Sequence, residues 1–303
     1  MKIIGEKIRW IDIAMPNQQD IRFLKSNFQI HPIILEELLG PSARSKVEVF
    51  NHYLYLVYFF PAYNKSEKAS YQSEIDFVIT KNEVITVHYE SFPPLDEFRR
   101  QLENEHFREK VFDQTYHLAY YLLESFINYF EREQHHISEK IEDISQKLFK
   151  GREEQLLKEI SYVKRDIANY SIIVHLQESV LKSLASKTQS FWPEHGRSVQ
   201  IFFEDLVGDQ LRVLNQINNI REIVDGLEET NSQLLASKTN NVMKTFTILA
   251  FFMYPLMLIS AIFSMRTDYT PIVGTPGDFW IILGIMLVTI AAMFSYFKNK
   301  TWL

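Results

Sequence analysis

The stretch TFTILAFFMYPLMLISAIFSM, residues 245–265, contains no charged side chain. As a helix rising about 1.5 Å per residue, it would span about 30 Å, the thickness of the hydrocarbon core of a bilayer. Residues 279–297 form a second uncharged stretch. Two core helices of a soluble domain are the alternative, but such helices rarely run this long without a polar face. The sequence therefore predicts two transmembrane helices near the C-terminus.

Basic residues concentrate on one side of the two predicted spans. Two lysines precede the first span, and two more follow the second span in the tail 298–303. The loop between the spans, residues 266–278, has a single basic residue, Arg266. Because Lys and Arg concentrate in cytoplasmic loops, we expect both termini and the basic tail in the cytoplasm and the loop on the other side. The chain is then a multi-pass protein of the cell (inner) membrane.

The overall composition narrows the class of protein. The chain has 303 residues, a formal net charge of −6 and no cysteine. The acidic balance argues against nucleic acid as a partner, and the lack of cysteine excludes disulfides and thiolate metal sites. The sequence contains no phosphate-binding loop, nucleophile elbow or zinc-protease motif. We therefore expect that the protein is not an enzyme.

Residues 1–110 predict a cytoplasmic α/β domain, because strand-like and helix-like patterns alternate there. Strands are expected at 7–15 and 46–63, a hairpin at 71–90, and helices at 19–28 and 31–39. The hairpin is expected to turn at Lys81 and Asn82, between two runs of β-branched and aromatic residues.

The rest of the chain is predicted to be helical. Residues 111–196 favour two long antiparallel helices that join near Gly151, because no proline lies between residues 112 and 190. Residues 197–265 predict one stalk helix that continues into the first span, since no proline lies between Gly196 and Pro255. Such a helix would be ~100 Å long at ~1.5 Å per residue. It needs neighbours along its length, which indicates an oligomer.

Two polar patterns lie on this long helix. Glu204, Asp205 and Asp209 fall close together, and carboxylates of this kind suit hard cations such as Mg²⁺, although a solvated acidic face is the simpler interpretation. A second pattern recurs at steps of three, four or seven residues and comprises Asn240, Met243, Thr247, Tyr254, Met257 or Leu258, and Ala261. That stripe could line a channel or pack against another helix.

Several segments, taken in order, resemble one family. The residues that carry the resemblance are SKTNNVMKTFTILAFFMYPLMLISAIFSM (237–265) and MFSYFKNKTWL (293–303), with IHPIILEELL (30–39), ARSKVEVFNHYLYLV (43–57) and FFEDL (202–206) upstream. Together they resemble the CorA family of divalent cation channels. The resemblance implies a funnel-shaped homopentamer in the lipid bilayer, with an α/β cytoplasmic domain, a long helical stalk and two C-terminal transmembrane helices. Divalent metal ions, above all Mg²⁺, are the implied substrates.

The resemblance also implies roles for particular residues. Carried over by position, the pore is lined by Asn240, Met243, Phe246, Tyr254, Met257 and Ala261. Asp205 matches a regulatory aspartate that binds cytoplasmic Mg²⁺ between subunits. Its partner on the neighbouring subunit falls at Asn64, where the family has an acid. An amide can coordinate a cation but adds no charge, so a weaker divalent sensor is expected.

The outer mouth of the pore departs from the family. The family signature there is Tyr-Gly-Met-Asn, whereas this chain has Phe263, Ser264, Met265 and Arg266, followed by Asp268. Arginine has five donors and no acceptor, so it cannot replace the carbonyl oxygen of asparagine. Five guanidinium charges at ~6 Å from a divalent ion would repel it by roughly 7 kcal/mol even at the dielectric constant of water. Salt screening and a pairing with Asp268 would reduce that repulsion.

The sequence thus predicts a CorA-like transporter or channel for divalent cations (Mg²⁺, with Co²⁺, Ni²⁺ or Zn²⁺ as further candidates) that has an altered outer entrance. Two alternatives stay open. One is a transporter with a different permeant ion or direction, because a ring of arginine favours anions or slows cation entry. The other is a membrane-anchored divalent-cation sensor that does not conduct.

Overall fold

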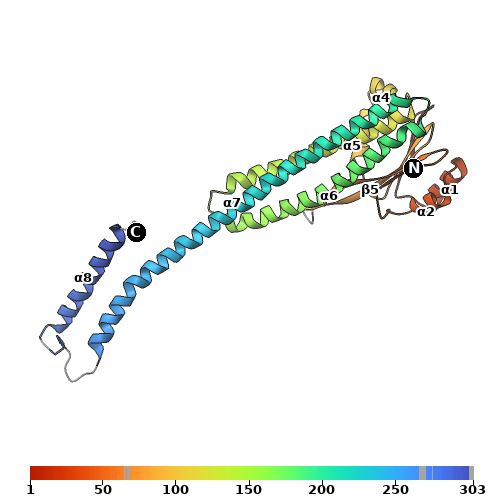
Figure 1. The fold of residues 1–303 in the computed structure, drawn as a ribbon. Helices are drawn as coiled ribbons and strands as arrows, with labels where there is room; N and C mark the ends of the chain where they lie inside the picture. The colour runs from red at the N-terminus through yellow and green to blue at the C-terminus, as the bar shows by residue number, and fades with distance from the viewer. Residues whose placement is uncertain (65, 67–68, 266–270, 275, 300–303) are drawn as a thin grey trace. The chain divides into compact units, whose positions relative to one another are not determined.

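The computed structural model describes residues 1–64, 66, 69–265, 271–274 and 276–299 (Figure 1). The chain divides into two compact units, Met1–Asn231 and Ser232–Leu303. The first unit combines one β-sheet with helices, and the second is helical. The fold is therefore a mixed α/β part, a long helix and two apolar C-terminal helices, as the sequence predicts.

The sheet of the first unit has six strands in the order β1-β2-β6-β5-β4-β3. The strands are β1 (Lys2–Ile4), β2 (Arg9–Ala14), β3 (Lys46–Val49), β4 (Leu54–Asn64), β5 (Ala69–Ile79) and β6 (Glu83–His88). Neighbouring strands are antiparallel except β2 and β6, which are parallel. The hairpin of β5 and β6 turns at residues 80–82, as predicted.

The segment 46–63 differs from its prediction, because it forms two strands rather than one. The chain turns between β3 and β4, where the backbone N–H of Phe50 donates to the carbonyl of Tyr53 at 2.9 Å. The rings of these two residues stack with their centroids 4.5 Å apart. Asn51 and His52 stand at the turn, and asparagine favours turn conformations. The aromatic residues on either side of the turn continue a strand-like sequence pattern, so the sequence did not predict this turn.

Two short helices cover one face of the sheet. In α1 (Gln18–Asn27) the side chain of Asn17 caps the first turn in a capping box with Asp20. Helix α2 (Pro32–Glu37) begins at Pro32, whose missing N–H costs nothing at that position. Buried residues of this face include Ile11, Leu24, Leu35, Tyr55, Val57 and Val78.

The opposite face packs against α3 (Pro93–Gln101) and α5 (Thr115–Lys147), and α4 (Glu105–Val111) packs in turn against these two helices. Its aromatic core joins Trp10 to Phe98 and Phe77 to Phe126, with ring centroids 5.5 and 6.1 Å apart. Burial of this apolar area is the main force that holds helices and sheet together.

Helix α6 (Glu153–Phe191) satisfies backbone groups that the sheet leaves open. Its Gln177 donates to the carbonyl of Phe59 at 2.9 Å, beyond the point where β3 pairs with β4. Asp166 accepts from the N–H of Ser70 at 2.6 Å, and Asn169 donates to the Ser70 carbonyl at 2.9 Å. Ser70 lies beyond the stretch of β5 that pairs with β6. Side chains of α6 thus replace missing neighbouring strands.

Helix α7 (Gly196–Ser264) contributes residues to both units, and α8 (Asp278–Asn299) belongs to the second unit alone. Within the first unit, α7 buries a stripe formed by Val199, Phe203, Leu206, Gln210, Val213, Ile217, Val224 and Asn231. Within the second unit, Phe251 and Phe252 contact Phe297 of α8, with ring centroids 5.9 and 5.7 Å apart. Both helices hold apolar stretches long enough to cross a membrane.

Candidate functional site: an exposed helix face and an acidic cluster

The residues predicted to line a pore share one face of α7. Asn240, Met243, Phe246, Tyr254, Met257 and Ala261 are all exposed in the single chain. The exposed fraction is 60% for Met243 and 69% for Tyr254. Apolar and aromatic side chains exposed to this degree indicate a surface that lipid or another copy of the chain covers. The pore roles themselves stay predictions.

The opposite face of α7 packs within the second unit. Phe252, Pro255, Leu256 and Ile259 are partly buried there, and Phe297 of α8 is buried. At about 100° per residue, these α7 positions lie roughly opposite Tyr254 and Ala261. Helix α8 therefore leaves the predicted pore stripe uncovered.

Hydroxyl groups near the start of the apolar stretch are tied to the helix itself. Thr245 donates to the carbonyl of Asn241 at 3.0 Å, and Thr247 donates to that of Met243 at 2.8 Å. Each hydroxyl oxygen keeps its lone pairs for a cation or water, since its single hydrogen is already used. At about 100° per residue, Thr247 falls on the predicted pore face and Thr245 on the opposite one. The pore face thus offers the oxygen atoms of Asn240 and Thr247 near its polar end, and methionine and aromatic side chains further along.

The structure describes the chain at the C-terminal end of α7 as far as Met265. The Ser264 hydroxyl donates to the carbonyl of Ala261 at 3.0 Å, and the backbone N–H of Met265 donates to the carbonyl of Ile262 at 3.3 Å. Both side chains are exposed. Arg266 and Asp268, the other residues of the predicted outer mouth, lie outside the described residues.

Asp205 belongs to an acidic cluster between α5 and α7. The hydroxyl of Tyr120 lies 2.9 Å from both Glu124 Oε1 and Asp205 Oδ2, so two carboxyl groups compete for one hydrogen. Burial raises the pKa of the Glu124 carboxyl, and the charges of Asp209 and Asp205 raise it further. The cluster therefore concentrates negative charge that a cation would relieve.

Arg212 partly neutralises the same region. Its Nε lies 2.9 Å from Glu131 Oε1, and its Nη2 lies 3.2 Å from Asp209 Oδ1. The pKa of Asp209 is nevertheless raised, because burial and the Asp205 charge outweigh the arginine. Of the three acids that the sequence singled out on this helix, the structure brings Asp205 and Asp209 into the cluster. Glu204 accepts a hydrogen bond from Gln200 at 2.6 Å.

Tyr120 and Glu124 were missed by sequence reasoning. Tyr120 lies 85 residues before Asp205, and only the folding of α5 against α7 brings the two together. The available signal was the spacing of Tyr120 and Glu124, which places them one turn apart on one face of a predicted helix. That pattern is too common to single out.

Asn64 ends strand β4. Its side-chain oxygen accepts from the backbone N–H of Ser66 at 3.0 Å and from the Ser66 hydroxyl at 2.7 Å. This oxygen is therefore already engaged in a local turn. The pairing of Asn64 with Asp205 across subunits stays a prediction. Among the described residues of one chain, no group of three or more His, Asp or Glu side chains is placed to hold a metal ion.

The two apolar helices and the α/β unit together indicate the class of protein: a membrane protein with an N-terminal α/β unit and two C-terminal transmembrane helices. The family described as CorA-like Mg²⁺ transporter protein matches residues 5–299. The chain therefore belongs to that family, whose members are transporters and not enzymes, as the sequence predicts.

Relatives match over nearly the whole chain. The cobalt/magnesium transport protein CorA of Thermotoga maritima is 25% identical over 297 residues, which cover 97% of this chain and 83% of that protein. Among solved structures, the complete CorA magnesium transporter from Methanocaldococcus jannaschii has a TM-score of 0.85 at 20% identity, covering 100% of this chain and 94% of that one. The full-length CmaX protein has a TM-score of 0.67 at 15% identity, covering 100% and 90%. At these identities, the structures show the fold alone.

Proposed function

We propose that five copies of this chain form a membrane channel for divalent cations, with Mg²⁺ as the first candidate and Co²⁺, Ni²⁺ and Zn²⁺ as others. The observation that carries the proposal is the family match over residues 5–299. Relatives of matching length are cobalt and magnesium transport proteins. The exposed stripe of α7 supports the same proposal, because it supplies the surface that a pore or a subunit interface needs.

In the proposed assembly, α7 of each subunit lines the axis and α8 lies outside it. Asn240 and the Thr247 hydroxyl would offer neutral oxygen atoms to a hydrated cation. Met243 and Met257 would form apolar rings, which can gate a pore by excluding water. The packing of Phe252 against Phe297 on the other face supports this orientation of α7.

The outer entrance is proposed to differ from that of its relatives. Ser264, Met265, Arg266 and Asp268 stand there, and a ring of arginine opposes cation entry unless its charge is drawn off the axis. We propose that Asp268, two residues further on, pairs with Arg266 of its own or an adjacent subunit. The carboxylate would then offset a charge that alone would nearly empty a cation site.

A cytoplasmic regulatory site is proposed at Asp205. Exposed carboxylate oxygens suit Mg²⁺, which keeps several waters and binds through one or two carboxylates. Glu124 and Asp209 add negative charge beside it. We place the remaining ligands on the neighbouring subunit, near Asn64, and expect a weak site because the amide contributes no charge.

The proposed location follows from the lysines that flank the spans. Both termini would lie in the cytoplasm and the loop 266–278 outside, in the cell (inner) membrane. The first unit, which carries the acidic cluster, would then sense the cytoplasmic concentration of the transported ion.

Ion flux into proteoliposomes tests the proposal. Wild-type protein is compared with Arg266→Asn, and with Arg266→Lys as a control that keeps the charge. We expect wild type to carry Mg²⁺ and Arg266→Asn to carry it faster. Flux of chloride instead of cations would favour a different permeant ion. Absence of flux for Mg²⁺, Co²⁺, Ni²⁺ and Zn²⁺ in all three proteins would favour a membrane-anchored sensor.

A further inference from the structure

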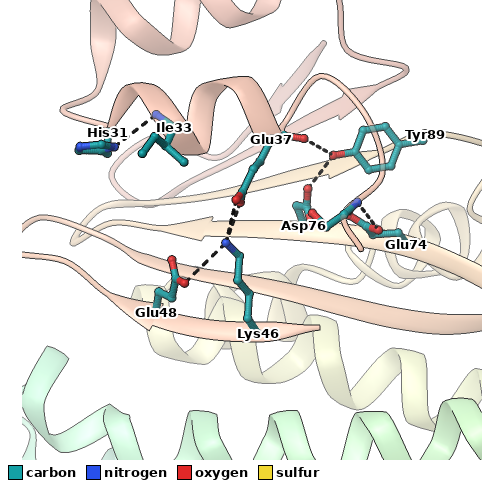
Figure 2. Close-up of polar contacts among 9 residues, drawn as sticks. His31, Ile33, Glu37, Lys46, Glu48, Glu74, Asp76 and Tyr89 are labelled. Atoms are coloured by element: carbon teal, nitrogen blue, oxygen red, sulfur yellow. Dashed lines mark hydrogen bonds and ion pairs between the residues drawn. The ribbon is translucent and has the colours of Figure 1, made fainter. Parts of the chain in front are cut away.

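Two buried carboxyl groups stand side by side in the sheet, far along the chain from Asp205. Glu74 and Asp76 are two residues apart on β5, so their side chains project from the same face. Glu74 is 6% exposed and Asp76 is fully buried. They face α2 and the segment that leads from α2 to β3 (Figure 2).

The hydrogen-bond partners of the two carboxyl groups differ. Both oxygens of Glu74 lie 2.8 Å from the backbone N–H of Ser42, which donates to them. Asp76 Oδ2 accepts from the Tyr89 hydroxyl at 2.7 Å. Asp76 Oδ1 is buried and accepts no hydrogen bond from any described residue. An ionised oxygen left in that position would carry a large desolvation cost.

No cationic side chain among the described residues around the pair is available to neutralise the Glu74 and Asp76 carboxyl groups. Lys46 Nζ of β3 lies 2.7 Å from Glu37 Oε2 of α2 and 3.6 Å from Glu48 Oε1 (Figure 2). The lysine therefore forms ion pairs with those two carboxylates. The other titratable groups that face the pair are the hydroxyls of Tyr55 on β4 and Tyr89 after β6. Helix α6 contributes the apolar side chains of Ile173 and Leu176 to this face.

We propose that Asp76 is a neutral carboxylic acid at neutral pH, and that its Oδ1 carries a proton and donates it in a hydrogen bond to the Glu74 carboxylate. The pair is then a buried proton-binding site. This arrangement gives Oδ1 a partner and leaves a single negative charge, which the Ser42 N–H stabilises.

Electrostatics place the proton on Asp76 rather than on Glu74. Burial raises the pKa of Asp76 well above its ordinary value, and the charge of Glu74 raises it further. Burial also raises the pKa of Glu74, but the hydrogen bonds from Ser42 act in the opposite direction. A carboxylate that accepts a backbone N–H bond is the better of the two anions.

Loss of the proton would place two negative charges next to each other inside the sheet. Because the folded state binds the proton more tightly than the unfolded chain, the stability that this proton contributes is fully present below pH 3.8, the ordinary pKa of the Asp76 carboxyl. It is lost as the pH rises through the raised pKa of the folded state. Release of one proton changes the unfolding equilibrium about tenfold per pH unit across that window. The connection from α2 to β3, which Ser42 ties to Glu74, is the segment expected to loosen.

Infrared spectroscopy of the full chain tests the assignment directly. Wild type should show the carbonyl stretching band of a protonated carboxyl group at pH 7, and Asp76→Asn should lack it. Glu48→Gln, which removes a neighbouring but more exposed carboxylate, should keep the band. A wild type without the band, or a band that survives in Asp76→Asn, overturns the proposal.

Hydrogen exchange gives a second, independent measurement. After correction for the intrinsic effect of pH, exchange at residues 39–45 should accelerate in wild type as the pH rises. In Asp76→Asn, where the amide mimics the neutral acid, the corrected rate should be independent of pH. If the two proteins show the same pH dependence, the pair does not hold a proton that controls this segment.

Discussion

The two parts of helix α7 differ in what stabilises them. Up to Asn231, a stripe of side chains is buried against the rest of the first unit. From Ser232 to Ser264, the side chains of one broad face are exposed, including large apolar ones such as Phe246 and Tyr254. The first part of this helix is thus stabilised by burial within its own unit, whereas the second part leaves one apolar face that its own chain does not cover. Four predictions sharpen this contrast, from the largest expected effect to the smallest.

Truncation of one phenylalanine in each part should give very different results. Phe203 is fully buried and its ring stacks on that of Trp192, with centroids 5.9 Å apart. Phe203→Ala should lower the free energy of unfolding of the first unit by about 3–5 kcal/mol, because it leaves a cavity. Phe246→Ala should change it by less than about 0.5 kcal/mol. Denaturant unfolding of the detergent-solubilised chain measures both, and equal losses would contradict the contrast.

A pair of amides extends the test to polar groups. Gln210 is buried and donates to the Val174 carbonyl at 3.3 Å and to Gln177 Oε1 at 2.9 Å. Gln210→Ala should cost about 1–3 kcal/mol of unfolding free energy, since two buried acceptors lose their donor. Asn240→Ala should leave the unfolding free energy unchanged and alter ion flux instead. Stability loss in Asn240→Ala would mean that this residue packs within the chain.

The acidic cluster should respond to Mg²⁺. We expect Mg²⁺ to protect the first unit against proteolysis, and Asp205→Ala to raise the required concentration about fivefold, or ~1 kcal/mol. Glu204→Ala is the matched control, because Glu204 lies outside the cluster. Unchanged protection in Asp205→Ala would remove this residue from the regulatory role.

The smallest effect is expected at the ion pairs between α6 and α7. Lys164 Nζ lies 2.7 Å from Asp225 and also contacts Glu228, and all three side chains are nearly half exposed. Lys164→Met should therefore lower the free energy of unfolding less than Phe203→Ala or Gln210→Ala, and less still at high salt. A loss as large as that expected for Phe203→Ala, in the same unfolding measurement, would show that exposed charges matter as much as the buried stripe.

The long periodic segments were predictable from the sequence, whereas the contacts between segments were not. The two apolar stretches, the stalk helix and the β5–β6 hairpin follow from patterns that a local window contains. The turn at Asn51 and His52 was missed, because the aromatic residues around it continue a strand pattern. The partner of Asp205 on α5 was missed, because a distance of 85 residues leaves no local signal.

The buried pair of Glu74 and Asp76 was only partly predictable from the sequence. The spacing of Glu74 and Asp76 places both acids on one face of a strand, which the sequence alone could have revealed. Only the fold shows that this face is buried and that Lys46 forms an ion pair with Glu37. Local pattern thus indicates which side chains are neighbours, and tertiary packing decides which of them keep their charge.

The side chains of α6 that occupy the open ends of β4 and β5 bear on assembly. Backbone groups left free at Phe59 and Ser70 would offer a template on which a strand from a second copy could pair. A chain that we propose to assemble in five copies brings such edges to high local concentration. By occupying those groups, Gln177, Asp166 and Asn169 prevent these stretches of β4 and β5 from pairing with a strand of a second copy.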